Sequence, residues 1–331
     1  MRSARGSWRL TNRRRRAAWV PYALTCLCIF ALIIPCYTRL GLVLRQHRER
    51  KSQTGIATVR THTSAHIGSK QGVTVVVLSS GSRQDELRTI LHYYLFKCNT
   101  QLVPEVMLVW NNHTNIGFEL THLSQMERLR IYVEGKNTLN NRYRHWRDIK
   151  TSATLLLDDD CIVYDIAFAL QVHLAHPSRI ICFYARAHRV RNDSTWPDSY
   201  DYVNPRRVGG KYSIGTGQAS LLSTTWLKRF NTDARLTKTR AFIDTNRPTC
   251  EDIALHMFVS NHTHLGPILV NADQAQLSAS TRGMSATRGW GEKRKACLSH
   301  FISETYDGMN PLIYSEFIRP LSADDSALIN D

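Results

Sequence analysis

Short apolar runs alternate with helical periodicity from residue 73 onward. Val73–Leu78, Val106–Trp110, Arg128–Val133 and Ala153–Leu157 are rich in β-branched and other apolar residues, which is typical of buried strands. Between the first two runs, Asp85–Lys97 has its apolar residues at helical spacing. Buried strands alternating with helices predict an α/β domain with a mostly parallel sheet and helices on both faces. Ligands of such sheets bind at the carboxyl ends of the strands.

The first 72 residues follow a different pattern. Residues 17–38 carry no formal charge and would form a helix of roughly 33 Å, long enough to cross a bilayer. Arg13–Arg16 precede this segment, so we expect a signal anchor with a cytosolic N-terminus. A cleaved signal peptide is the alternative, but no small-x-small cleavage site follows. The sequence thus predicts a single-pass type II protein of the Golgi or endoplasmic reticulum membrane.

The remaining organisation follows from composition. Residues 39–72 are polar and lack apolar periodicity, which indicates a solvated stem. We therefore expect a cytosolic tail (1–16), an anchor (17–38), a stem (39–72), a luminal domain (73–320) and a short tail (321–331).

The net charge of +16 is concentrated outside the predicted domain. The cytosolic tail has seven Arg and no acidic residue, and the stem has seven basic residues against one acidic residue. The rest of the chain is left with +3, which gives little support to a nucleic-acid-binding protein. With 43% hydrophobic and 21% charged residues, the chain is also not a disordered protein.

Cysteines and sequons agree with a luminal domain. Five of the eight cysteines lie beyond residue 72, none in a C-x-x-C pair: Cys98, Cys161, Cys182, Cys250 and Cys297. In an oxidising compartment we expect one or two disulfides and at least one free thiol. Asn112, Asn192 and Asn261 each begin an Asn-x-Ser/Thr sequon and are candidate glycosylation sites.

Three consecutive carboxylates follow the apolar run that ends at Leu157. On an extended segment Asp158 and Asp160 point to the same side and Asp159 to the other. Neighbouring carboxylates repel one another unless a cation lies beside them, and oxygen ligands suit magnesium or manganese. Such an ion could neutralise a diphosphate. The alternative is a solvated acidic turn.

Two further polar groups could belong to the same site. Asn137, Asn140, Asn141 and Arg142 combine amides, which can bind a base or ribose, with a guanidinium that matches phosphate oxygens. A polar turn before a helix would also explain the asparagines.

A second pair of candidates lies near residues 250 and 290. Glu251 and Asp252 begin a helical pattern, where helix capping would account for one of them. Gly283–Gly291, followed by Glu292–Lys295, predicts a mobile basic loop suited to a diphosphate, or else a solvated turn.

Seven separated motifs resemble the exostosin-like glycosyltransferases, family 64. They are VTVVVLSS, LVWNN, NTLNNR, TLLLDDDC, YARAH, NRPTCEDIA and GEKRKAC, within residues 73–318. The LNNR, CEDIA and EKR-x-x-C pieces are most similar to short plant-type members that glycosylate inositolphosphoceramide sphingolipids; animal members build heparan sulfate. The resemblance implies a GT-A fold, which is Rossmann-like, and a retaining transfer with manganese, or magnesium in its place.

The same resemblance implies a role for each matching residue. Asn111 and Asn137 would contact the donor nucleotide, Asn141 and Arg142 its ribose or diphosphate, with Asp158 and Asp159 also on the donor. Asp158 and Asp160 would lie at the metal, with Asp160 as the direct ligand.

The transfer step itself is implied for a second group of residues. Asp252 would sit beside the reacting sugar and the acceptor, Arg294 would bind the leaving diphosphate, and Cys250 would pair with Cys297. Animal members tend to have Asp-Asp where this chain has Glu251-Asp252, a difference that concerns the acceptor.

The resulting hypothesis is a transferase that moves a hexose or N-acetylhexosamine onto a glycan or sphingolipid. UDP-N-acetylhexosamine and GDP-mannose are both candidate donors. The alternative is a non-catalytic glycan-binding or complex-forming module with the same fold, which manganese-dependent hydrolysis of a nucleotide sugar would distinguish.

Overall fold

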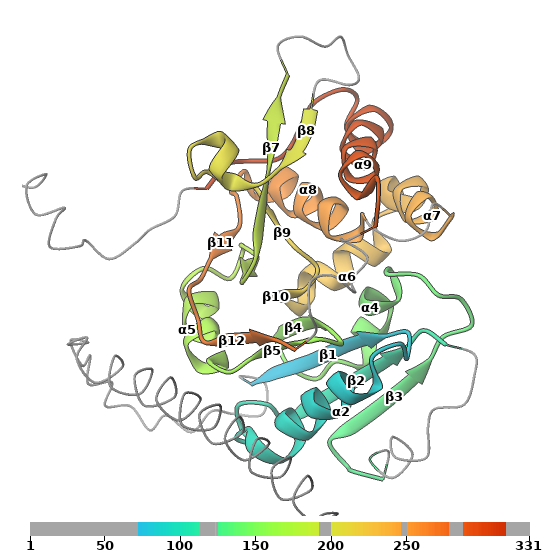
Figure 1. Ribbon diagram of the computed structural model, residues 1–331, viewed down its shortest axis with the longest axis vertical. Helices are drawn as coiled ribbons and strands as arrows, with labels where there is room; N and C mark the ends of the chain where they lie inside the picture. The colour runs from blue at the N-terminus through green and yellow to red at the C-terminus, as the bar shows by residue number, and fades with distance from the viewer. Residues whose placement is uncertain are drawn as a thin grey trace, which may run out of the picture. The chain divides into compact units, whose positions relative to one another are not determined.

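The computed structural model describes residues 72–112, 123, 125–191, 200–245, 250–277 and 287–315. Within these ranges a seven-stranded sheet has the order β11-β6-β10-β4-β1-β2-β3 (Figure 1). Its strands are β1 Val73–Ser79, β2 Glu105–Trp110, β3 Leu129–Val133, β4 Ala153–Asp158, β6 Ile181–Cys182, β10 Ala219–Ser223 and β11 Ile268–Leu269.

Both faces of this sheet are buried. Along β1, Val73, Val75 and Val77 pack into one core while Val76 and Leu78 pack into another. Successive side chains of a strand point to opposite faces, so a strand covered on both sides must be apolar throughout. The continuous apolar runs of the sequence are the result.

Helices cover the two faces unequally (Figure 1). One core includes α2 (Gln84–His92), the π-helical turn η1 (Tyr93–Lys97) and α5 (Ile166–Ala175). The other includes five helices: α4 Asn141–Arg144, α6 Thr224–Thr232, α7 Thr237–Thr245, α8 Glu251–Thr263 and α9 Trp290–Thr305. Three 3-10 turns are also present: η2 (His145–Asp148) after α4, η3 (Pro205–Val208), and η4 (Ala234–Leu236) between α6 and α7.

Two small sheets extend the domain beyond the central one. Strand β5 (Cys161–Val163) pairs with β12 (Gln274–Gln276), and β7 (Ala185–Val190) lies between β8 (Tyr200–Val203) and β9 (Ile214–Gly215).

The expected α/β class with a mostly parallel sheet is confirmed. Strands β4, β1, β2 and β3 are mutually parallel, and β10 alone in this sheet runs antiparallel to its neighbours β4 and β6. In register, Leu78 pairs with Asp158 and Ser79 with Trp110, so β1, β2 and β4 all end at one edge of the sheet.

One expected loop is a helix. Residues 292–295 lie in α9, which begins at Trp290 after Gly289, whose φ of 79° is in the left-handed region. Glycine adopts a positive φ without strain. Gly289 therefore marks the start of α9 and is not part of a loop. The part of that prediction covering residues 278–286 lies outside the described residues.

The predicted membrane anchor at residues 17–38 also lies outside the described residues. Of the helices that are described, none has the length and apolar character needed to cross a bilayer.

Candidate active site

A cavity of about 480 Å³ opens at the shared carboxyl edge of β1, β2 and β4. Parallel sheets bind ligands at this edge, because the loops after adjacent strands converge there. The opposite wall comes from β8, α8 and α9, and from the connection between β9 and β10. Lining residues include Asn111, Asn137, Arg142, Asp158, Asp159, Asp160, Tyr202, Gly217, Glu251, Asp252, Trp290 and Arg294.

The three consecutive aspartates have distinct surroundings. Asp158 accepts a hydrogen bond of 2.6 Å from Arg142 Nη2, and its side chain is 29% exposed. Asp159 is held by Ser79 Oγ at 2.6 Å and by Arg83 Nη1 at 2.7 Å. Arg83 also lies 3.5 Å from Asp160 Oδ2. The expected alternation does not extend through the triplet, because β4 ends at Asp158 and Asp159 and Asp160 form a turn. All three nevertheless line the cavity.

The carboxylate oxygens at this edge of the sheet suit a hard divalent cation that is also coordinated by the bound substrate. No cluster of three or more His, Cys, Asp or Glu side chains that could hold a metal occurs among the described residues. Magnesium-type sites, however, often use one or two carboxylates and complete their coordination with substrate phosphates and water. Asp158 and Asp160 could serve as such a pair. Burial raises the pKa of Asp158, opposed by the Arg142 guanidinium, so a nearby cation would favour its charged form.

The asparagines form a small network beside the carboxylates. Asn111 Nδ2 donates to Asn137 Oδ1 (3.2 Å) and to the Thr138 carbonyl (2.8 Å). Asn141 Nδ2 donates to Asn111 Oδ1 at 2.7 Å. Asn111 and Asn137 line the cavity, whereas Asn141 is fully buried behind Asn111 and supports it. Asn140 faces Asp244 instead, with its amide 2.7 Å from Asp244 Oδ1.

Arg142 joins the strand edge to the helical wall. Besides Asp158, its Nη1 donates to the Gly217 carbonyl at 2.5 Å and lies 3.8 Å from Glu251 Oε1. The side chain is only 3% exposed, and the acidic groups keep its pKa above the usual value despite burial. Arg142 is therefore a permanent positive charge inside the cavity wall.

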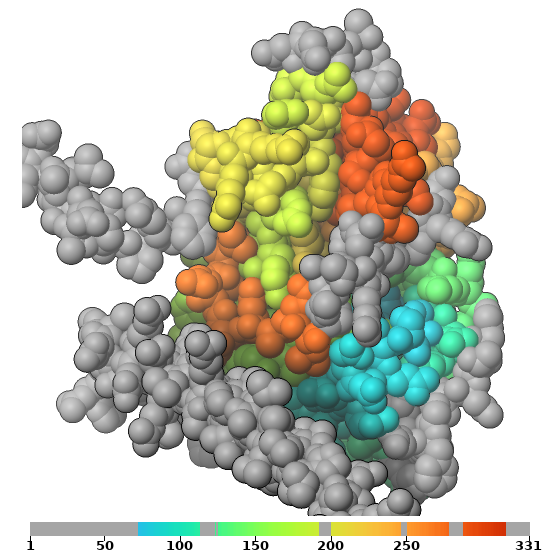
Figure 2. All heavy atoms as spheres, viewed as in Figure 1, coloured from blue at the N-terminus to red at the C-terminus, as the bar shows by residue number. Residues whose placement is uncertain are grey.

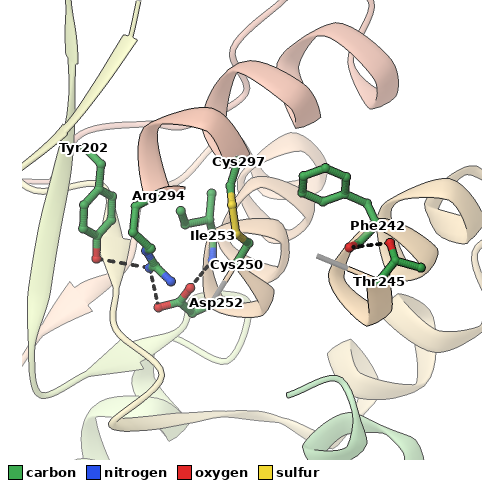
Figure 3. The surroundings of a disulfide bond; sticks show 8 residues. All are labelled: Tyr202, Phe242, Thr245, Cys250, Asp252, Ile253, Arg294 and Cys297. Carbon is green, nitrogen blue, oxygen red and sulfur yellow. Dashed lines mark hydrogen bonds and ion pairs between the residues drawn. A yellow bond between two sulfur atoms is a disulfide. The ribbon is translucent and has the colours of Figure 1, made fainter. Parts of the chain in front are cut away.

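Asp252 and Arg294 form a second buried pair (Figure 3). Arg294 Nη2 donates to Asp252 Oδ2 at 2.7 Å and to the Tyr202 hydroxyl at 3.1 Å. The carboxylate also accepts from Gly217 N (3.0 Å) and, through Oδ1, from Ile253 N (2.7 Å). Both side chains are below 10% exposed, so each charge depends on its partner.

Glu251 lines the same cavity one residue earlier. Its side chain is 3% exposed, and Oε2 has no hydrogen-bond partner within the described parts of the chain. Burial raises the pKa of Glu251 to about 7, the Asp252 charge adds to the rise, and Arg142 and Arg294 oppose it. Glu251 can thus hold a proton near neutral pH.

A disulfide ties the two helices that supply the second pair. Cys250 and Cys297, whose Cα atoms lie 6.1 Å apart, are bonded just before α8 and inside α9 (Figure 3). This is the pairing that the family resemblance implies. Cys98, Cys161 and Cys182 are free thiols.

Aromatic rings enclose Arg294 from two sides. The Arg294 guanidinium carbon lies 4.6 Å from the Tyr202 ring centroid and 5.6 Å from that of Trp290. Figure 2 shows α9 in red-orange beside the yellow-green strands β7 and β8, and α9 packs against β8. Cation–π contacts of this kind restrict the guanidinium to one place in the wall.

Three contributors to the wall carry no distinctive sequence signal: Arg83, Tyr202 and Trp290. Gly217 had a weak signal in the Gly-Thr-Gly string, because a Cβ there would approach Glu251 Oε1 within 2.7 Å. The close packing explains why a glycine occupies this position.

Of the three sequons, one begins beside the cavity, one lies on α8 and one lies outside the described residues. Asn112 donates from Nδ2 to the Ser80 carbonyl at 3.2 Å, and Asn261 lies in the last turns of α8. Asn192 is outside the described residues. Glycosylation at these positions stays a prediction.

Comparison with known proteins gives a family match over most of the chain. A model described as the glycosyl transferase family 64 domain matches residues 73–321.

Three relatives represent the similarity. Glycosylinositol phosphorylceramide mannosyl transferase 1 of Arabidopsis thaliana is 26% identical over 75% of this chain and 76% of its own length. Exostosin-like 2 of Mus musculus is 26% identical over 73% of this chain and 75% of its own length. Glucosamine inositolphosphorylceramide transferase 1 of Oryza sativa subsp. indica is 31% identical over 59% of this chain but 25% of its own length.

Proposed function

The chain belongs to glycosyltransferase family 64, and from this premise we propose a retaining, metal-dependent transfer of a hexose or N-acetylhexosamine from a nucleotide-diphosphate sugar. The observation that carries the proposal is that two arginine–carboxylate pairs with buried guanidinium groups, Arg142–Asp158 and Arg294–Asp252, face one cavity. A diphosphate brings negative charge, and the sugar bond that must break lies next to it. A cavity with cationic and carboxylate groups at both ends can bind the diphosphate and act on the sugar bond beside it.

The strand edge would hold the donor. Asn111 and Asn137 present amide groups to a nucleotide, and Asp158 and Asp160 would hold manganese, with magnesium as a substitute. The metal, when bound, would neutralise charge on the diphosphate. The GT-A assignment is part of this proposal.

The helical wall would carry out the transfer. The bond between the anomeric carbon and a diphosphate oxygen breaks, and a bond to the acceptor hydroxyl oxygen forms on the same face of the sugar. The proton of that hydroxyl passes to the departing diphosphate oxygen. Arg294 stabilises the charge left on the diphosphate, which is greatest as that bond breaks. Asp252 either attacks the anomeric carbon or orients the acceptor. A sugar trapped on the Asp252 peptide and detected by mass spectrometry would establish the first route.

We propose a glycolipid as the acceptor, in a membrane of the Golgi or endoplasmic reticulum. Support comes from the names of two relatives, both of which refer to an inositolphosphorylceramide, and from the predicted anchor at residues 17–38. Those names differ in the sugar, mannose against glucosamine, so GDP-mannose and UDP-N-acetylhexosamines are both candidate donors.

The test is donor hydrolysis by the purified 331-residue chain. UDP-N-acetylglucosamine, UDP-N-acetylgalactosamine and GDP-mannose are each incubated with manganese, and release of UDP or GDP is measured. We expect one donor to be hydrolysed and the activity to disappear with EDTA. No hydrolysis of any donor, with nucleotide binding retained, would favour a non-catalytic module of the same fold.

A further inference from the structure

Residues 215–218, the last residue of β9 and its connection to β10, touch both arginine–carboxylate pairs; we call this segment the bridging loop. At its centre, Gly217 N donates to Asp252 Oδ2 at 3.0 Å and its carbonyl accepts from Arg142 at 2.5 Å. At its end, the Gln218 carbonyl accepts from Asp158 N at 3.0 Å. A shift of this loop would therefore displace both halves of the cavity.

The start of the bridging loop is held by a histidine that does not line the cavity. His256 lies on α8, one turn after Asp252, and is 2% exposed. Its Nε2 lies 2.9 Å from Gly215 N, and its Nδ1 lies 2.8 Å from the Asp252 carbonyl oxygen. The imidazole thus connects the backbone of the loop to the backbone of the residue whose carboxylate the loop binds.

These two partners allow only one form of the imidazole. A carbonyl oxygen can only accept, so Nδ1 must carry the proton, and a backbone N–H can only donate, so Nε2 must be bare. Burial also lowers the pKa of His256, which favours the neutral ring. Gly215 packs closely against the ring: a Cβ at this position would approach His256 Nε2 within 2.9 Å and Cys182 Cβ within 2.5 Å.

We propose that His256 is a positioning residue, which keeps the bridging loop in register with α8 so that Gly217 N–H stays on the Asp252 carboxylate. This inference rests on the proposed transferase activity and adds to it a residue that touches neither donor nor acceptor. Small displacements of a catalytic carboxylate lower the rate of the reaction more than they weaken substrate binding. The reason is that the reaction requires a closer alignment of the reacting atoms than binding does.

Three substitutions separate positioning from packing. His256→Gln places an amide oxygen where Nε2 lies and can accept from Gly215 N. His256→Asn ends near the position of Nδ1 and cannot reach Gly215, and His256→Leu removes both contacts. The measurements are kcat and donor KM for manganese-dependent hydrolysis of the preferred nucleotide sugar, together with the melting temperature. His173→Leu, which replaces another buried histidine on α5, is the control.

We expect His256→Leu and His256→Asn to lower kcat at least about tenfold while donor KM stays within about threefold. His256→Gln should recover most of the loss, and His173→Leu should lower only the melting temperature. The Gln and Asn pair decides the result if the Leu variant does not fold.

Two outcomes would overturn the proposal in distinguishable ways. With an active wild-type chain, equal kcat in the Gln and Asn variants would contradict the positioning role alone. A wild-type chain that hydrolyses no donor would contradict the proposed function and the positioning role with it.

Discussion

The two sides of the cavity are built by different means. On one side, Asp158 is the last residue of β4 and Asn111 directly follows β2, so their backbone is fixed by parallel strands of the sheet. On the other, Asp252 and Arg294 stand on helices that are joined by a disulfide, and the helix of Asp252 also contacts the bridging loop. The strand side needs only correct strand pairing, whereas the helical side needs several long-range contacts at once.

This difference matters for function, since the two sides are assigned different tasks. Donor and metal binding tolerate small displacements, because part of the coordination comes from the ligand itself. The transfer step needs accurate alignment of the reacting atoms. The side with more interlocking contacts is the one to which we assign the more demanding step.

The largest effect is expected on the helical side. Asp252→Asn should fold and bind UDP or GDP with manganese within about threefold of wild type, yet lose transfer by about 10²–10³-fold. The amide oxygen can still accept from Gly217 N and Arg294, while the carboxylate charge is gone. Donor hydrolysis and isothermal titration with the nucleotide measure the two properties.

Asp233→Asn provides the matched control for that variant. Asp233 also pairs with an arginine, Arg235, at 2.6 Å, but it does not line the cavity. Wild-type turnover in Asp252→Asn would remove Asp252 from the mechanism.

On the strand side, we expect a substitution to weaken nucleotide binding before it affects the transfer step. Asp160→Asn is expected to weaken manganese-dependent nucleotide binding by about 10–100-fold, because one of the two oxygen donors loses its charge. Titration of UDP and GDP with and without manganese checks this. Asp165→Asn, at the N-cap of α5, removes a carboxylate elsewhere and should bind as wild type. Unchanged metal dependence in Asp160→Asn would contradict the metal assignment.

The strand side was also the more predictable from sequence. The apolar runs gave β1, β2 and β4 to within one residue, and parallel strands necessarily bring Asn111 and Asp158 to one edge. One local prediction on this side was wrong: Asp158–Asp160 do not continue as a strand, because β4 ends at Asp158 and the chain then turns.

The helical side could not be derived from periodicity. Asp252 and Arg294 are 42 residues apart, and only the family resemblance suggested that they act together. The start of α9 was interpreted as a loop because glycines and charges dominate it, while its buried apolar residues begin only at Cys297. Tyr202 and His256 gave no signal, since their roles depend on partners distant in sequence or on the fold of the bridging loop.

Removing the disulfide tests whether the helical side depends on it. Cys250→Ser with Cys297→Ser should lower the free energy of unfolding by about 4 kcal/mol, because the closed loop spans 47 residues. Nucleotide binding should change little, and kcat should fall less than in Asp252→Asn. Chemical denaturation and donor hydrolysis measure these effects. Cys98→Ser, at a free half-buried cysteine, is the control, and equal stability of the two variants would argue against a structural disulfide.

The smallest effect concerns Glu251, which lies between the two sides. Its folded-state pKa of about 7 exceeds the ordinary value for a glutamate, so the folded protein binds more protons than the unfolded chain between about pH 4.5 and 7. The protonated form therefore contributes stability that is fully present below pH 4.5 and is lost as the pH rises through 7. Glu251→Gln, which mimics that form, should melt about 3–5 °C above wild type at pH 8 and show no difference at low pH. Melting curves from pH 4.5 to 8 test this, with the exposed Glu304→Gln as control. Parallel curves for wild type and Glu251→Gln would mean that Glu251 stays charged between Arg142 and Arg294, and that the two sides of the cavity are joined by an ion pair and not by a protonated acid.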